Sequence, residues 1–263
     1  MKIFDAHGHI ASWQSIEESE KALLYGMEQH GIGGCLISNA DCATFPSERR
    51  IDYPSLSAEA GLKTAIDFAR KHPGKIYVAA WITPRREKVP SQELIDLIED
   101  NRDIVKSLKL HPFCERMAPN DERMEPYYDL ARKLDLPFLV HTAMDPDSAI
   151  GNIVDAAKAH PDIRFVAAHL ELMSNHLYAI EVLREVPNVY CDTAWVEMPI
   201  AVRALNELGP DRVFFGTDAP VDGEETLDHP YYRTYFENTE RLGEEDYARL
   251  MAQNALNFYR IRE

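Results

Sequence analysis

The chain has 263 residues, of which 45% are hydrophobic and 27% are charged, a balance typical of soluble globular proteins. Its formal net charge of −16 argues against nucleic acid and anionic membranes as partners, because both bind basic surfaces. No apolar run approaches the length of a membrane span, and the first residues carry no signal-peptide pattern.

Eight short apolar runs along the whole chain predict β-strands. Most are rich in Val, Ile, Phe or Leu and do not alternate strictly, as is typical of parallel strands covered by helices. The predicted strands cover residues 2–6, 34–38, 75–82, 105–110, 137–141, 164–169, 188–192 and 212–216.

Amphipathic stretches between these runs predict helices. The first has Glu17 and Glu18 near its start and Gly31 just beyond its end, which favours a helix there. The predicted helices cover residues 15–29, 57–71, 91–99, 125–134, 147–160, 174–186, 199–208 and 244–258.

Strands that alternate with helices indicate βαβ units with right-handed crossovers. Eight such units in this length close most naturally into a (β/α)8 TIM barrel of the α/β class, which we expect to form one domain over residues 1–263. A doubly wound dinucleotide-binding sheet is the alternative, but no Gly-x-Gly-x-x-Gly follows the first strand.

The longest irregular stretch, residues 219–233, would cover the barrel mouth. The segment 219–235 carries several tyrosines, with Tyr232 and Tyr235 among them, and suits a lid or a subunit contact.

Four cysteines, Cys35, Cys42, Cys114 and Cys191, form no Cys-x-x-Cys pair and match no disulfide framework or zinc ribbon. Cys35 and Cys191 fall inside predicted strands, so we expect reduced core cysteines. A reducing compartment, hence the cytoplasm, is the expected location.

Polar residues gather where the predicted strands end, and in a (β/α)8 enzyme those ends carry the active site. His7 and His9 are two residues apart, so on a strand both imidazoles point to the same face. A single histidine after a strand is usually structural, but half of the ten histidines of the chain fall at such ends, and this distribution indicates a metal site. The polar residues at strand ends are His7, His9, His111, His141, His169, Asp192 and Asp218.

Five short motifs in this order resemble the amidohydrolase superfamily, and specifically its amidohydrolase-related branch, amidohydrolase 2. They are Asp5-Ala6-His7-Gly8-His9, Lys109-Leu110-His111-Pro112, Val140-His141-Thr142, Ala168-His169-Leu170 and Phe215-Gly216-Thr217-Asp218-Ala219-Pro220. The resemblance spans nearly the whole chain and implies a distorted barrel with a divalent metal ion at its mouth.

The resemblance also implies residue roles. His7, His9, His141 and Asp218 match the metal ligands of the superfamily, and such a set suits zinc, with manganese as the alternative. His169 matches a strand-six histidine that contacts the bound water or the substrate, and Asp218 would accept a proton from that water.

Four residues are candidates for substrate binding: Lys109, His111, Trp81 and Trp195. Lys109 has three readings, namely contact with an anionic substrate group or support of the site, a carbamate that bridges two metal ions, and a purely structural lysine. His111 has similar standing, with substrate contact, support of the site and a structural role all open, and the two tryptophans are either pocket walls or ordinary packing.

The leading hypothesis is a metal-dependent hydrolase of a small-molecule ester, lactone or amide. The alternative is a lyase that performs non-oxidative decarboxylation or hydration of a small carboxylated substrate, and a third hypothesis is a ligand-binding barrel without catalysis. Arginines in predicted loops could clamp a carboxylate, although surface exposure explains them equally: Arg49, Arg50, Arg85 and Arg86. The sequence leaves the oligomeric state open, a homo-oligomer included.

Overall fold

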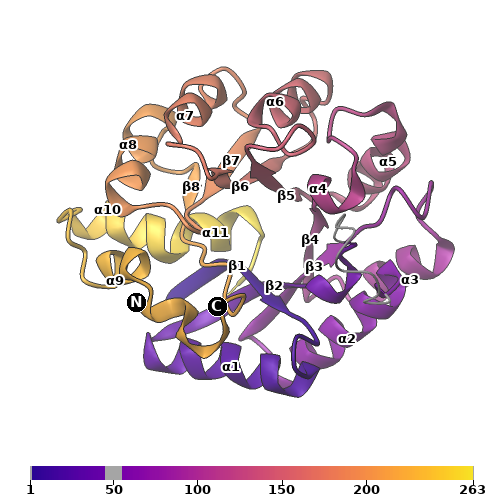
Figure 1. The fold of residues 1–263 in the computed structure, drawn as a ribbon, viewed down its shortest axis with the longest axis horizontal. Coiled ribbons are helices and arrows are strands. Elements are labelled where there is room, and N and C mark those ends of the chain that lie inside the picture. The colour runs from indigo at the N-terminus through magenta and orange to yellow at the C-terminus, as the bar shows by residue number, and fades with distance from the viewer. Residues whose placement is uncertain (1, 45–54, 263) are drawn as a thin grey trace.

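Eight parallel strands surrounded by helices form the (β/α)8 barrel that the sequence predicts (Figure 1). The computed structural model describes residues 2–44 and 55–262. Strands that follow one another in the chain are neighbours in the sheet, in the order β1 to β8. The strands are β1 (Ile3–Ile10), β2 (Ile32–Asn39), β3 (Ile76–Trp81), β4 (Val105–Leu110), β5 (Phe138–Ala143), β6 (Phe165–Leu172), β7 (Val189–Asp192) and β8 (Val213–Phe214).

The barrel closes between the first strand and the end of the last one. The amide of Ala6 donates to the carbonyl of Phe215 at 2.8 Å, and Gly8 pairs in parallel with Ala219. The buried carboxylate of Asp5 fastens this seam, because it accepts from the amide of His7 at 3.0 Å and from the amide of Thr217 at 3.1 Å. Burial raises the pKa of Asp5 to about 7.

Three predicted strands end at least two residues before the observed ones, and the difference matters for the site. β1 runs to Ile10 because it stays paired with β2 beyond the apolar run, with His9 opposite Ser38. β5 and β6 likewise continue past His141 and His169. These histidines therefore lie within strands, where ladder hydrogen bonds fix their backbone, and not in the loops that follow.

Helices occupy most of the predicted positions. Serine caps set three starts: the hydroxyls of Ser15, Ser57 and Ser91 accept from backbone amides three residues on. The helices are α1 (Ile16–Gln29), α2 (Ala58–Lys71), α3 (Gln92–Asp100), α4 (Pro112–Glu115), α5 (Glu125–Leu134), α6 (Ile150–Ala159), α7 (Leu177–Leu183), α8 (Met198–Leu208), α9 (Pro230–Phe236), α10 (Glu244–Ala248) and α11 (Asn254–Phe258). Short single turns complete the set: η1 (Ala40–Cys42), η2 (Glu122–Met124), η3 (Gly223–Asp228) and the π-helical turn η4 (Arg249–Gln253).

Three helix predictions and one prediction of an irregular stretch need correction. The stretches 147–160 and 174–186 contain only the shorter α6 and α7, and η4 interrupts the last predicted helix. The stretch 219–233 is not irregular, because it contains η3 and the start of α9. Tyr232 and Tyr235 are fully buried there, and their hydroxyls donate to the carbonyls of Thr217 and Val196. Both tyrosines therefore belong to the core under the mouth and form neither a lid nor an exposed subunit contact.

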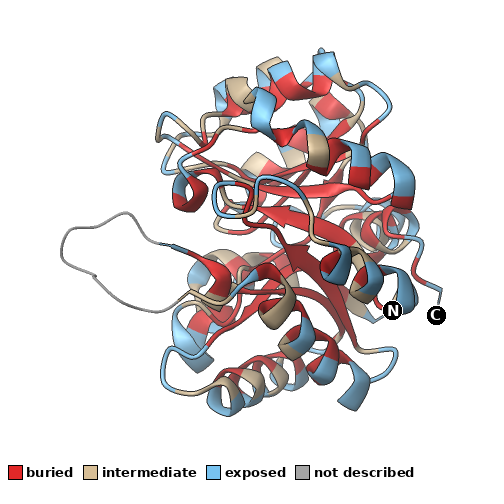
Figure 2. Cartoon of the chain, turned by 90° about the vertical axis from the view of Figure 1, so that its right-hand side faces the viewer, coloured by how far each residue is buried: buried red, intermediate tan, exposed pale blue. Residues whose placement is uncertain are grey.

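The core has two main parts, one between sheet and helices and one inside the barrel. Inside, alternate residues of the strands meet, among them Phe4, Leu36, Leu139 and Phe214. Figure 2 shows the strands almost entirely buried and the exposed residues on the outer faces of the helices. In the described part of the chain, no helix is both long and apolar enough to cross a membrane.

Candidate metal centre at the barrel mouth

Six aromatic side chains, five from β1, β3, β5 and β6 and one from the residue after β4, form a closed ring around the barrel mouth, which we call the mouth ring. Each member lies next to the following one, and the last closes on the first. The successive centroid distances are 5.1 Å (His7–His9), 6.3 Å (His9–Trp81), 5.7 Å (Trp81–His111), 3.8 Å (His111–His141), 4.8 Å (His141–His169) and 4.9 Å (His169–His7).

Three members of the ring have their Nδ1 atom held by a neighbouring group. A hydrogen bond at Nδ1 fixes the orientation of an imidazole, and where Nδ1 donates, it leaves Nε2 with a lone pair, as in the histidine ligands of metal sites. The partners are Asp192 Oδ2 for His7 (2.9 Å), Ser38 Oγ for His9 (3.0 Å) and the Ala194 carbonyl for His169 (3.1 Å). Since a carbonyl only accepts, Nδ1 of His169 must donate and its Nε2 is free of a proton when the ring is neutral.

Asp218 completes this side of the mouth from the loop after β8. Its Oδ1 lies 2.8 Å from Nε2 of His9 and 3.3 Å from Nε2 of His7. Its Oδ2 accepts from the indole Nε1 of Trp195 at 3.0 Å. Burial opposes the charge, but the His9 hydrogen bond and the nearby imidazoles keep the pKa of Asp218 well below its ordinary value.

Ligand atoms of His7, His169 and Asp218 lie within 4.8 Å of one another. Two imidazoles and an ionised carboxylate are donors that divalent transition metals prefer, and burial lowers the pKa of His169 to about 4, so it is neutral as a ligand must be. The residues therefore fit a divalent ion. Of the four ligands implied by the resemblance, His9 and His141 are not in this cluster: Nε2 of His9 lies 2.8 Å from Oδ1 of Asp218, and the ring of His141 stacks on His111 at 3.8 Å.

Gly8 explains how β1 and the last loop approach so closely. A Cβ atom at this position would lie 2.6 Å from Sγ of Cys35 and 3.3 Å from the carbonyl oxygen of Ala219. A side chain between His7 and His9 would thus push the strand away from its neighbours.

Lys109 lies beneath the ring and is only 1% exposed. Its Nζ is 3.0 Å from Nε2 of His7, and no carboxylate of the described residues lies within 4 Å of it. Burial lowers the pKa of Lys109 to about 8, with Asp218 and Asp192 opposing the shift. The ammonium group therefore keeps most of its charge at pH 7 in a place where few groups compensate it.

The β3–β4 side of the ring has polar atoms without protein partners. Among the described residues, neither Nε1 of Trp81 nor Nδ1 of His111 makes a hydrogen bond, and both atoms are buried. Trp81 itself is 3% exposed, so bulk water does not replace the missing partner.

Two of the loop arginines lie in the described part of the chain, and both are exposed. Arg86 donates to the carbonyls of Cys42 and Leu56, and the amide of Arg85 donates to Glu115. Arg49 and Arg50 lie outside the described residues.

The sequence identified Asp192 only as a strand end, and the structure assigns it three contacts. Besides His7, it accepts from the amides of His169 and Ala194. The sequence offered one signal for this role: Asp192 is the acidic residue at the end of the seventh predicted strand.

Backbone strain marks the same side. His169, Trp195 and Asp218 all have left-handed backbone, with φ of 68°, 60° and 66°. Such conformations cost about 1–3 kcal/mol each for residues other than glycine and concentrate at functional sites.

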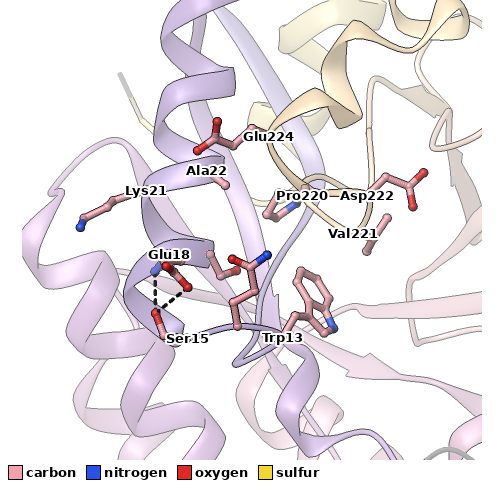
Figure 3. A pocket seen from close by; sticks show the side chains of 12 residues that line it. Trp13, Ser15, Glu18, Lys21, Ala22, Pro220, Val221, Asp222 and Glu224 are labelled. Carbon is pink, nitrogen blue, oxygen red and sulfur yellow. Dashed lines mark hydrogen bonds between the residues drawn. The ribbon is translucent and has the colours of Figure 1, made fainter.

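A hollow of about 490 Å³ lies on the rim outside the ring, between the start of α1 and the loop after β8 (Figure 3). Trp13 flanks it from one side and Val221 and Asp222 from the other. It contains none of the ring side chains.

Several solved structures share this fold. 5-Carboxyvanillate decarboxylase from Sphingomonas paucimobilis is 15% identical, with 99% of each chain covered and a TM-score of 0.70. A dihydroxybenzoic acid decarboxylase from Polaromonas sp. with bound manganese and 2-nitroresorcinol is 15% identical, with 99% of this chain and 97% of that chain covered and a TM-score of 0.69. A protein from Acinetobacter baumannii assigned as a 2-pyrone-4,6-dicarboxylic acid hydrolase is 11% identical, with 99% and 100% covered and a TM-score of 0.70.

At these identities the likeness concerns the fold, and no curated protein sequence matches the chain. The family model described as amidohydrolase, by contrast, matches residues 4–261 and so includes every strand-end residue discussed above. The chain is therefore a member of the amidohydrolase family, with the (β/α)8 barrel of that family and a buried His-His-Asp cluster at its mouth.

Proposed function

We propose that the protein is a divalent-metal-dependent hydrolase that cleaves an ester, lactone or amide bond of a small molecule. The observation that carries this proposal is the ionised Asp218, whose Oδ1 faces two imidazole Nε2 atoms that are held in place from behind. A divalent ion bound there would polarise a substrate oxygen and lower the pKa of water from about 15.7 towards about 7.

The chain's own groups then have defined tasks. Asp218 is ionised at neutral pH and can take the proton of the attacking water. His169 is neutral and has a free Nε2, so it can accept a hydrogen bond or a proton at the reacting centre. His169 is buried and the side chain of Asp218 is 15% exposed, so bulk water has little access to either group.

The ligand set is part of the proposal. His7 and Asp218 are common to the family resemblance and to the cluster, His9 lies 2.8 Å from Asp218, and we propose zinc, or manganese in its place, as the ion. For the remaining imidazole the resemblance implies His141, whereas the distances favour His169. The metal content of alanine variants separates His141 from His169. Replacing the histidine that binds the ion should remove the ion, and replacing the other should leave it bound. We expect His169→Ala and His141→Ala to differ in bound metal after equal dialysis.

A second function, decarboxylation of a small carboxylated substrate, is supported by Lys109. A buried ammonium without a carboxylate partner is costly unless an anion completes the site. A substrate carboxylate would supply that charge, and the indole N–H of Trp81 would be a further donor. In this reaction the substrate anion takes up one proton at carbon and releases carbon dioxide.

The experiment that separates the two functions uses protein stripped with a chelator and reloaded with Zn²⁺ or Mn²⁺. Lactones and esters are assayed for release of acid, and hydroxylated benzoates for release of carbon dioxide. We expect acid release with uncharged or carboxylated lactones. Carbon dioxide release without acid release would replace the hydrolase with the lyase, and bound metal without any turnover would favour a ligand-binding barrel.

A further inference from the structure

The two oxygens of Asp218 have different partners. Oδ1 faces His7 and His9, at 3.3 Å and 2.8 Å, and Oδ2 accepts from Nε1 of Trp195 at 3.0 Å. An indole N–H can only donate, so Oδ2 of Asp218 must be the acceptor in this hydrogen bond. The hydrogen bond therefore holds one oxygen away from the imidazoles and leaves the other towards them.

Trp195 is itself held by the core. Its backbone amide donates to the hydroxyl of Tyr232 at 3.1 Å, and that hydroxyl donates to the carbonyl of Thr217 at 2.5 Å. Tyr232 is fully buried, so one hydroxyl joins Trp195 to the residue that precedes Asp218. The indole also packs edge-on against His229, with centroids 5.2 Å apart.

The backbone conformation makes this arrangement demanding. Trp195 and Asp218 both have left-handed φ values, 60° and 66°, which residues with a Cβ rarely adopt. Two strained residues that face each other through a hydrogen bond are unlike ordinary wall packing, where the polar edge of a tryptophan points to any available acceptor. The geometry thus specifies the direction of the carboxylate and not only the shape of the pocket.

We propose that Trp195 is a positioning residue that restricts Asp218 to binding the ion through Oδ1 alone, and that Tyr232 anchors it. This inference rests on the proposed metal site. The indole N–H is already bonded to the protein, so Trp195 acts on the ligand and leaves substrate recognition to other residues. Binding through both oxygens would require Oδ2 to leave the indole.

The test is the variant Trp195→Phe, which removes the indole N–H and keeps an aromatic ring. Cobalt(II) is the probe, because its visible absorption changes with coordination number and geometry. Partners of ligand side chains typically contribute 10–100-fold to metal affinity, so we expect Trp195→Phe to bind cobalt about 10–100-fold more weakly, with an altered absorption band. Trp13→Phe, at an exposed tryptophan on the rim, is the matched control and should keep the wild-type band.

Tyr232→Phe keeps its ring but removes the joining hydroxyl, and we expect a smaller change in the same direction. Tyr25→Phe, an exposed position on α1, is its control. Wild-type affinity and band in Trp195→Phe overturn the inference and leave the proposed function standing. Should Trp195→Phe not fold, an unchanged band in Tyr232→Phe overturns it instead. Wild-type protein that binds neither cobalt nor manganese removes the metal site, and the inference with it.

Discussion

The mouth ring has two sides that differ in how their polar atoms are paired. On the side of β1 and β6, each histidine has its Nδ1 bonded to a group behind it, and Asp218 faces the Nε2 atoms of His7 and His9. On the side of β3 and β4, Trp81 and His111 have buried polar atoms without partners among the described residues.

The difference indicates what each side is built to bind. Groups fixed from behind are pre-organised, and a small ion with fixed bond directions needs such ligands. Buried groups without partners lower stability until a ligand provides their hydrogen bonds. The β1–β6 side therefore suits an ion, and the β3–β4 side suits the polar groups of a substrate.

The largest effect should come from Asp218→Asn, which removes the carboxylate that faces the Nε2 atoms of His7 and His9. Loss of both ligand charge and proton acceptor should lower kcat/KM about 100- to 10,000-fold. Bound metal, measured by plasma emission after dialysis, should fall in parallel. Asp222→Asn, at an exposed position of the same loop, should change neither.

Asp192→Asn should have the next largest effect on metal binding. It replaces the carboxylate oxygen that contacts Nδ1 of His7 with an amide NH2 group, which donates and cannot accept. We expect metal affinity to fall about 10–100-fold, as measured by competition with a chelating dye. The fold should survive, since the amide oxygen can still accept from the amides of His169 and Ala194. Asp211→Asn, an exposed residue just before β8, is the control. An unchanged metal affinity would show that the hydrogen bond at Nδ1 of His7 does not determine how the β1–β6 side binds an ion.

Lys109→Met tests the other side of the ring. A charge-assisted hydrogen bond contributes about 1.5–3 kcal/mol, so KM for a carboxylated substrate should rise roughly 10- to 150-fold. KM for an uncharged ester should stay the same. Lys106→Met, on the same strand but with its amine on the backbone of Arg102, is the control. An equal rise for both substrates would mean that Lys109 supports the site and does not bind the anion.

The smallest effect concerns stability on the β4 side, where Glu115 is 1% exposed and its Oε1 has no partner among the described residues. Burial raises the pKa of Glu115 to about 6, so the folded state binds more protons than the unfolded state between pH 4.5 and 6. Stability from this group is therefore present at low pH and is lost as pH rises through that window.

Glu115→Gln should remove this loss and stabilise the protein by about 2 kcal/mol at pH 7. Denaturant unfolding at pH 4 and pH 7 measures the change, which should be absent at pH 4. Glu122→Gln, at an exposed position, should have no effect at either pH.

Much of the fold could be predicted from the sequence because apolar runs and helix caps are local signals. Ser15, Ser57 and Ser91 mark helix starts to within one residue. Strand ends were predicted less well: His9 pairs with Ser38 of the next strand, and such pairing depends on a segment about thirty residues away.

The same distinction applies to the site. Repetition of histidines at strand ends revealed which residues meet, since parallel strands bring their ends together. It could not reveal that Nδ1 of His169 bonds to the Ala194 carbonyl or that Trp195 bonds to Asp218, because those contacts depend on left-handed backbone in two loops. A tryptophan in a sequence carries no sign of where its N–H points.

The seam fastened by Asp5 has a consequence for how the protein is made. His9 and Asp218 are 209 residues apart and come together only when the first strand meets the end of the last. A growing chain thus cannot bring these two side chains together until Asp218 has been synthesised and the barrel has closed. Ion uptake would report completed folding, and an ion at 100 times its Kd would stabilise the closed form by about 2.7 kcal/mol.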